Sequence, residues 1–341
     1  MEMRGFHIGI RRVCAVAIGA VLFLSGMLKL MDPVGSGLVM GEYFRFFHVD
    51  FLQPVSKIAG VISAMFETLL GIALVTGIWR RVTSIVTMAT LAFFTILTLI
   101  LLIANPDMSC GCFGEAFPLT HMQSFIKNLV LCLLACVAFL PLCDDTAPRV
   151  PKYIAFAATA AFAVAFMAHS LVNVPYLDFT EFARGNELEA GAFSFRDAFG
   201  DYYDLSEMDG NSLVVTVYDP ERMDVADWGD VAESIDAALT NSLMPILVTP
   251  YMDGVPSELC EFLYFADGKT LMTFNRSNGG VTYVSDRLVV GKWARGTMPD
   301  DEEFSEFVRE DPDDVMLDGI THRRLCAEGT VLACFAVMLL L

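Results

Sequence analysis

Long uninterrupted runs of apolar residues fill the first half of the chain. A helix needs about 20 such residues to cross the hydrocarbon of a bilayer, whereas a soluble helix of this length would show a polar face. The first run has the length of a signal peptide, but no small-residue cleavage site follows it, so we interpret it as a retained helix. The pattern predicts an all-α transmembrane bundle over residues 1–175, with helices at 13–30, 58–79, 82–104, 125–142 and 153–174.

Shorter strand and helix patterns replace these runs after residue 175. Buried strands are predicted at 213–218 and 245–249, with turn residues after the first. Residues 281–285 and 288–291 predict an antiparallel pair. Helices are predicted at 225–239 and 257–265.

This order is that of a thioredoxin-like α/β core, which we expect at residues 176–322. A dithiol thioredoxin carries C-x-x-C after its first core strand, because a helix N-terminus lowers the thiol pKa there. Here the position reads Asp219-Pro220-Glu221-Arg222, so the domain is expected to lack dithiol chemistry. Residues 325–341 predict a short apolar helix that closes the chain.

Charge divides the chain at the same place. Residues 1–175 hold 11 Lys and Arg against 9 Asp and Glu, whereas residues 176–325 hold 11 against 31. The net charge of −19 leaves no basic surface for nucleic acid. With these helices crossing in turn, seven Lys and Arg lie on the side of the membrane that holds the N-terminus and four on the opposite side. We therefore expect a cytoplasmic N-terminus and an extracytoplasmic acidic domain in a bacterial inner-membrane protein.

Two of the nine cysteines form the one cluster whose spacing suggests chemistry. Cys110 and Cys112 flank Gly111 in the loop after the third predicted helix, and a disulfide between them would be strained and easily reduced. Two alternatives are separate thiols and a partial metal site that includes His121. The latter lacks the four ligands of structural zinc, so we predict no metal. Cys132 and Cys136 lie on one helix face, where packing is the simpler interpretation.

Glu67 is the single acid deep within a predicted span. Such residues usually face the interior of the bundle. Two interpretations remain open: a protonated carboxyl bonded to a neighbouring helix, and a proton relay or hydrogen-bond partner for a quinone head group.

Two blocks of sequence resemble the DoxX/MauE group of membrane proteins, over residues 8 to 145. One is Ser25-Gly26, Lys29 and Asp32-Pro33, followed by Glu42-Tyr43-Phe44. The other runs from Asn105-Pro106 through Cys110-Gly111-Cys112-Phe113-Gly114 to Lys127-Asn128.

The resemblance implies a four-helix redox-type core. MauE-like proteins are associated with methylamine utilisation, through disulfide formation or maturation of a periplasmic dehydrogenase subunit, and DoxX-like relatives with quinone-coupled sulfur oxidation. The acidic half resembles an extension found on some of these proteins, with Gly279 where proline is usual.

We therefore expect a membrane thiol–disulfide oxidoreductase or maturation factor. Cys110 and Cys112 would exchange with extracytoplasmic protein thiols, and electrons would pass to a membrane quinone near Glu67. The alternative is a non-enzymatic assembly or scaffold protein whose C-x-C loop is structural or binds metal.

Overall fold

The computed structural model describes residues 2–108, 110–140 and 150–340. The chain divides into two compact units, residues 1–169 with 328–341, and residues 170–327. Cys143, which the sequence places at a helix end, lies outside the described residues.

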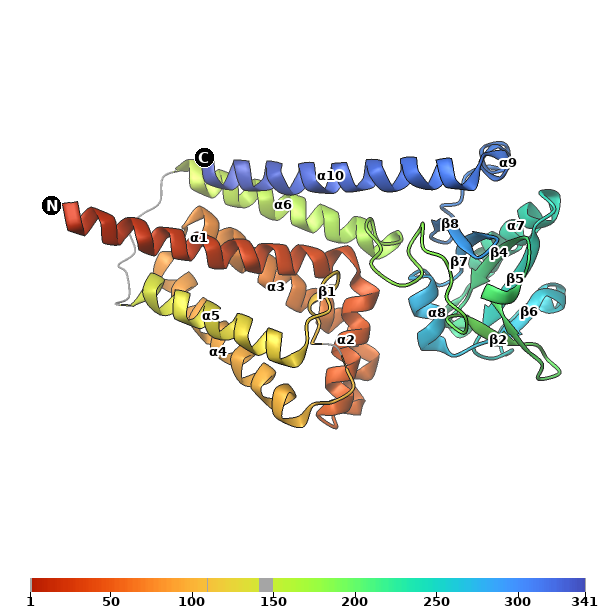
Figure 1. Cartoon of the computed structure of the whole chain (residues 1–341), viewed down its shortest axis with the longest axis horizontal. Coiled ribbons are helices and arrows are strands. Elements are labelled where there is room, and N and C mark those ends of the chain that lie inside the picture. Colours follow the sequence, from red (N-terminus) through yellow and green to blue (C-terminus); the bar gives the residue numbers. More distant parts are fainter. Residues whose placement is uncertain (1, 109, 141–149, 341) are drawn as a thin grey trace. The chain divides into compact units, whose positions relative to one another are not determined.

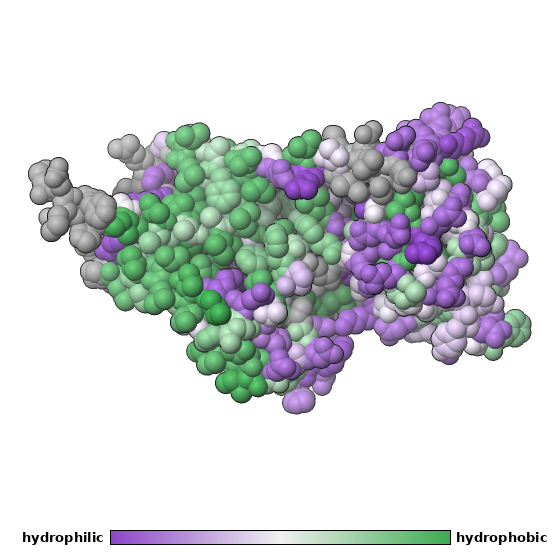
Figure 2. Space-filling model, viewed as in Figure 1, coloured by the Kyte–Doolittle hydropathy of each residue, from purple (hydrophilic) through white to green (hydrophobic). Residues whose placement is uncertain are grey.

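Helices build the first unit (Figure 1). They are α1 (Glu2–Met31), α2 (Pro33–Phe46), α3 (Ser56–Thr76), α4 (Arg80–Ala104), α5 (His121–Phe139) and α6 (Val150–Val172), with a 3₁₀ helix η1 (Asp50–Val55) and a short strand β1 (Cys112–Glu115). In the described part of the chain, five helices are long and apolar enough to cross a membrane: α1, α3, α4, α5 and α6. The five predicted spans are thereby confirmed. Their outer surfaces are covered by apolar side chains, while hydrophilic side chains dominate the second unit (Figure 2).

Helix α2 was not predicted, because its many small residues give no apolar run. Asp32 caps it by accepting a hydrogen bond from the Gly35 amide at 2.8 Å, and Pro33 has the backbone angle that a first helical position needs. The segment between the first two predicted helices is therefore itself a helix, which folds back beside α3.

Helices α1 and α3 cross at very short range. A Cβ at Gly26 would lie 2.2 Å from Thr68 Oγ1, and one at Gly71 would lie 2.5 Å from the Phe23 nitrogen. Small residues allow such close approach between membrane helices. The crossing places Ser25 and Glu67, the neighbours of Gly26 and Thr68, within reach of each other.

Two apolar clusters hold the first unit together. One joins α1, α3, α4 and α5 through Ile18, Leu22, Leu70, Leu91 and Leu131. The other joins α1 and α3 to α6 and to the end of the last helix, α10 (Pro312–Leu340), through Phe23, Ile72, Ala163 and Met338. Helix α10 begins at Pro312, earlier than the predicted start at residue 325.

The second unit contains a mixed sheet in the order β3-β2-β6-β5-β4-β7-β8. Its strands are β2 (Ser194–Arg196), β3 (Tyr202–Asp204), β4 (Asn211–Thr216), β5 (Met244–Thr249), β6 (Leu263–Phe265), β7 (Gly280–Ser285) and β8 (Leu288–Trp293). Strands β4, β5 and β6 are parallel, and β7 and β8 form the predicted antiparallel pair.

Both faces of this sheet are covered, which explains why its central strands read as continuous apolar runs. Successive side chains of a strand point to opposite faces. Leu213 and Val215 of β4 accordingly pack with helix α7 (Val225–Thr240), whereas Val214 packs with helix α8 (Gly268–Phe274). The acidic helix α9 (Asp301–Arg309) adds Phe304 to the α7 side.

The helix predicted at residues 257–265 is wrong. The segment forms a 3₁₀ helix, η4 (Ser257–Phe262), and then strand β6. The apolar spacing over the six residues of η4 is too short to distinguish a 3₁₀ helix from an α-helix. The last residues of the segment form a strand because they pair with β5.

Candidate functional site

Glu67 lies at the α1–α3 crossing with both carboxylate oxygens in contact. Lys29 Nζ is 2.6 Å from Glu67 Oε1, and Ser25 Oγ is 2.7 Å from Oε2. The Glu67 side chain is 2% exposed and that of Lys29 is 15% exposed. Ser25 and Lys29 are four residues apart on α1, so they lie on one helix face. An intramembrane acid thus has a charged partner, which offsets the cost of burying it.

Ser25 also joins this pair to the thiol loop. Its Oγ is 2.6 Å from the carbonyl oxygen of Cys112 as well as 2.7 Å from Glu67 Oε2. A serine hydroxyl has one hydrogen to donate. The Cys112 carbonyl and the Glu67 carboxylate therefore share that one hydrogen. The loop backbone and Glu67 are linked through the Ser25 hydroxyl.

The Cys110-Gly111-Cys112 loop is held so that its two thiols meet. Their sulfur atoms are 2.9 Å apart. Tyr43 of α2 donates a hydrogen bond to the Cys110 carbonyl at 2.8 Å. Gly111 has φ +59°, and a Cβ there would lie 2.3 Å from Val39 Cγ1. Only glycine satisfies both the backbone angle and the close approach.

The electrostatic environment makes the two thiols unequal. The hydrogen bond from the Cys110 thiol, followed by the charges of Lys127 and Lys29, lowers the pKa of Cys112 to about 5, although burial opposes the shift. The same hydrogen bond, together with burial, raises the pKa of Cys110. Cys112 is therefore the thiolate of the pair and Cys110 its proton donor.

Helix α5 supplies Lys127 to this loop in a fixed orientation. A capping box between Thr120 and Gln123 starts the helix. Asn128 then donates hydrogen bonds to the Phe94 carbonyl at 3.1 Å and to Thr98 Oγ1 at 3.2 Å, which ties α5 to α4. Lys127, beside it, has its ammonium 4.8 Å from the centre of the Phe113 ring.

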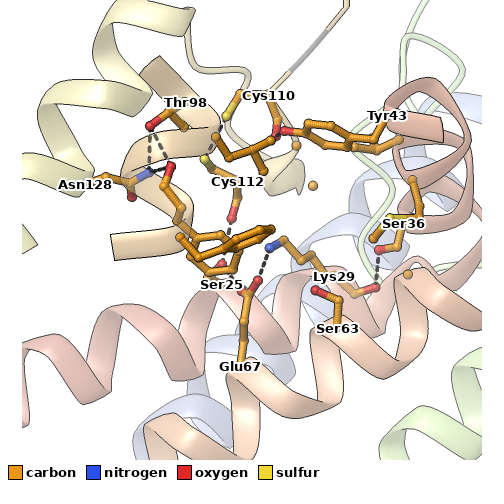
Figure 3. A pocket seen from close by; sticks show the side chains of 18 of the residues that line it. Ser25, Lys29, Ser36, Tyr43, Ser63, Glu67, Thr98, Cys110, Cys112 and Asn128 are labelled. Atoms are coloured by element: carbon orange, nitrogen blue, oxygen red, sulfur yellow. Dashed lines mark hydrogen bonds and ion pairs between the residues drawn. The ribbon is translucent and has the colours of Figure 1, made fainter. Parts of the chain in front are cut away.

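One cavity of about 340 Å³ is lined by Ser25, Lys29, Tyr43, Glu67, Cys110, Cys112, Lys127 and Asn128 (Figure 3). Its polar wall comes from α1, α3, the thiol loop and α5. Its apolar wall comes mainly from α2 and α4 and includes Met40, Phe44, Phe47, Phe93, Phe94 and Leu97. The volume is at the lower end of the range of about 300–1,000 Å³ for small-molecule sites, which are typically apolar with few polar groups.

All three residues that the sequence singles out, Cys110, Cys112 and Glu67, line this cavity. Sequence reasoning missed the contact of Glu67 with Ser25 and Lys29. The signal that could have revealed this contact is the spacing of Ser25 and Lys29. They are four residues apart shortly before Asp32-Pro33, which places both on one helix face at the end of a span.

The remaining cysteine and histidine candidates lie elsewhere or have other contacts. Cys132 Sγ is 3.2 Å from Thr95 Oγ1 between α5 and α4, and Cys136 is exposed. His121 Nε2 is 3.1 Å from the Pro106 carbonyl oxygen. Within the described residues, no three His, Cys, Asp or Glu side chains are grouped as metal ligands.

Fold and site together define a multi-pass membrane protein whose helix bundle holds a paired thiol loop beside an intramembrane Lys–Glu pair. Residues 9–141, which contain every site residue described above, match the family described as methylamine utilisation protein MauE. The membrane half of the chain is thus MauE-like. No curated protein and no solved structure matches the chain.

Proposed function

We propose that this protein is a membrane thiol–disulfide oxidoreductase of MauE type, acting in protein maturation for methylamine utilisation. The observation that carries the proposal is the Cys110–Cys112 pair, with sulfur atoms 2.9 Å apart, in one cavity with Glu67 and Lys29. A pair with one stabilised thiolate and one protonated thiol suits reversible exchange better than a permanent crosslink.

The client half-reaction begins from the Cys110–Cys112 disulfide. A client thiolate attacks Cys110, and Cys112 leaves as the thiolate, because the thiol of lower pKa is the better leaving group. A second client thiolate attacks the client sulfur of the mixed disulfide and releases Cys110, which takes up a proton. The client gains a disulfide, and the enzyme pair gains two electrons.

The second half-reaction restores the disulfide at the expense of a membrane quinone as second substrate. The Cys112 thiolate and the Cys110 thiol form the disulfide, while the quinone takes two electrons and two protons to become the quinol. One proton comes from Cys110, and the other reaches the quinone from Glu67, which Ser25 links to the loop and which takes up the second proton released by the client thiols in the first half-reaction. The mainly apolar cavity with Lys29 in its polar wall supports such a ligand.

The acidic unit is proposed to recruit clients from the extracytoplasmic side. Its segment β5-β4-β7-β8, two parallel strands beside an antiparallel hairpin, has the order expected of a thioredoxin-like core. At the dithiol position, the backbone N–H and carbonyl of Asp219 are both held at 2.9 Å by the Asn278 amide. This turn therefore suits binding rather than exchange.

The test is quinone reduction by the purified full-length protein, with a small dithiol in place of the client. Wild type is expected to turn over, and Cys110→Ser and Cys112→Ser to be inactive. Cys132→Ser, which changes a cysteine outside the cavity, should retain activity. Glu67→Gln should fold but lose about 10²–10⁴-fold in turnover, the usual effect of losing a general acid–base group.

Two outcomes would contradict the proposal. Activity in Cys110→Ser would exclude the pair as the reacting group. No turnover by wild type, together with thiols that mass spectrometry of native membranes finds permanently reduced or metal-bound, would favour the assembly protein with a structural or metal-binding loop. An active Glu67→Gln variant would instead leave Glu67 a structural link between α1 and α3.

A further inference from the structure

The apolar wall of the cavity reaches the outer surface of the helix bundle. Phe93 of α4 and Phe47 at the end of α2 both line the cavity, yet Phe93 is 60% and Phe47 44% exposed. A side chain that belongs to both a cavity wall and the outer surface marks an opening. The cavity is therefore open between α2 and α4.

This opening faces lipid rather than water. Phe93 is followed on the same exposed face of α4 by Ile96, Ile100 and Ile103. Helix α4 is one of the helices long and apolar enough to cross a membrane, and a charge-free apolar face on such a helix is the face that meets hydrocarbon. A water-soluble ligand would have to pass through that hydrocarbon to use this entrance.

The size of the cavity indicates how much of a ligand it encloses. About 340 Å³ is at the lower limit for small-molecule sites and accommodates a ring-sized head group. A long apolar chain attached to that ring has to continue outside. The aromatic side chains at the opening offer it the large apolar contact areas that such rings provide.

We propose that the ligand of this cavity is a polyprenyl-tailed quinone that enters sideways from the bilayer. Its head group lies by Ser25, Lys29 and Cys112, and its isoprenoid tail leaves between Phe47 and Phe93. The inference rests on the proposed function for the redox chemistry, and adds the route and the requirement for a tail.

The experiment compares a long-tailed quinone with a tail-less analogue that has the same ring, using full-length protein. Phe93→Ala and Phe47→Ala remove apolar contact from the tail and should each raise KM for the tailed quinone about tenfold. KM for the tail-less analogue should not change. Phe66→Ala is the matched control, because Phe66 is also 44% exposed on a spanning helix but does not line the cavity.

A second readout needs no turnover. A quinone with a photoreactive group on its first isoprene units should crosslink to α2 and α4 near Phe47 and Phe93, and should do so in Cys110→Ser as well. Crosslinking there without turnover would support the binding route while refuting quinone reduction. Turnover with KM unchanged by both opening variants, or crosslinks only elsewhere, would overturn the lateral route and leave the oxidoreductase proposal intact.

Discussion

Lys127→Met tests how the structure divides the two thiols into a thiolate and a proton donor. Methionine keeps most of the length and apolar stem of lysine but removes its charge. The charge of Lys127 is among the causes that lower the pKa of Cys112 to about 5, after the hydrogen bond from Cys110. Without it, the thiolate of Cys112 should be less favoured, while the Cys110 hydrogen bond and the charge of Lys29 remain.

The size of the effect follows from the change in thiolate population. An opposite charge within hydrogen-bonding range lowers a pKa by about 1–3 units, so its removal should raise the Cys112 pKa by a similar amount. If the pKa moves from about 5 by about 2 units, the thiolate fraction at pH 6 falls about tenfold. At high pH, both proteins have the full thiolate, and the difference should vanish.

The assay is the pH dependence of alkylation at Cys112, resolved from Cys110 by mass spectrometry of the reduced full-length protein. Lys127→Met should react about tenfold more slowly at pH 6 and equally at high pH. The matched control is Lys152→Met on α6, a lysine that does not line the cavity. Identical profiles for wild type and Lys127→Met would refute the assignment of Cys112 as a thiolate stabilised by Lys127.

Two further predictions concern the buried ion pair of the acidic unit and the glycine of the thiol loop. Lys292 Nζ is 2.6 Å from Asp178 Oδ2, and the two side chains are 3% and 12% exposed. Lys292→Met should therefore lower the free energy of unfolding, measured with denaturant, by about 3–5 kcal/mol. The control Arg287→Met, at an exposed ion pair, should lower it by about 0–1 kcal/mol. Burial raises the pKa of Asp178, but the pair with Lys292 and hydrogen bonds from Thr180 outweigh burial and lower the pKa. The stability that this carboxylate contributes is therefore present above its unfolded-state pKa and is lost as the pH falls through its folded-state pKa. A wild-type acidic unit with no such acid sensitivity would contradict the pairing. Gly111→Ala should slow disulfide formation between the loop thiols in a diamide assay, since its Cβ would lie 2.3 Å from Val39 Cγ1; adding Val39→Ala should restore part of the rate, and no restoration would exclude this contact as the cause.

The part of the fold that could be predicted is the set of helices whose composition is set by the bilayer hydrocarbon. Hydrocarbon demands about 20 apolar residues per helix, so the five spans could be located from composition alone. Helix α2 could not, because its buried glycines leave no apolar run: Gly37 brings its backbone against Lys57 of α3, and Gly41 against Gln53 of η1. The strands β2 and β3 were missed for a similar reason: they are three residues each and are defined by pairing, β3 with β2 and β2 with β6, not by a pattern of their own.

The individual site residues could be predicted from the sequence, but their proximity in one cavity could not. Cys110, Cys112 and Glu67 each stand out through local chemistry, whereas their proximity depends on a crossing of α1 and α3 that Gly26 permits. That crossing brings Ser25 to Glu67 across 42 positions of sequence and to the Cys112 carbonyl across 87.

The α1–α3 crossing also explains how one hydroxyl serves the two halves of the proposed reaction. If α1 and α3 were separated by an ordinary pair of apolar side chains, Ser25 would not reach Glu67. Lys29 would likewise lose its 2.6 Å contact to the Glu67 carboxylate. At the distance that Gly26 and Gly71 allow, the Ser25 hydroxyl contacts Glu67 and the thiol loop at once. In the proposed reaction, the coupling between thiol and proton chemistry would thus follow from small residues at a helix crossing, and not from any sequence motif that contains both groups.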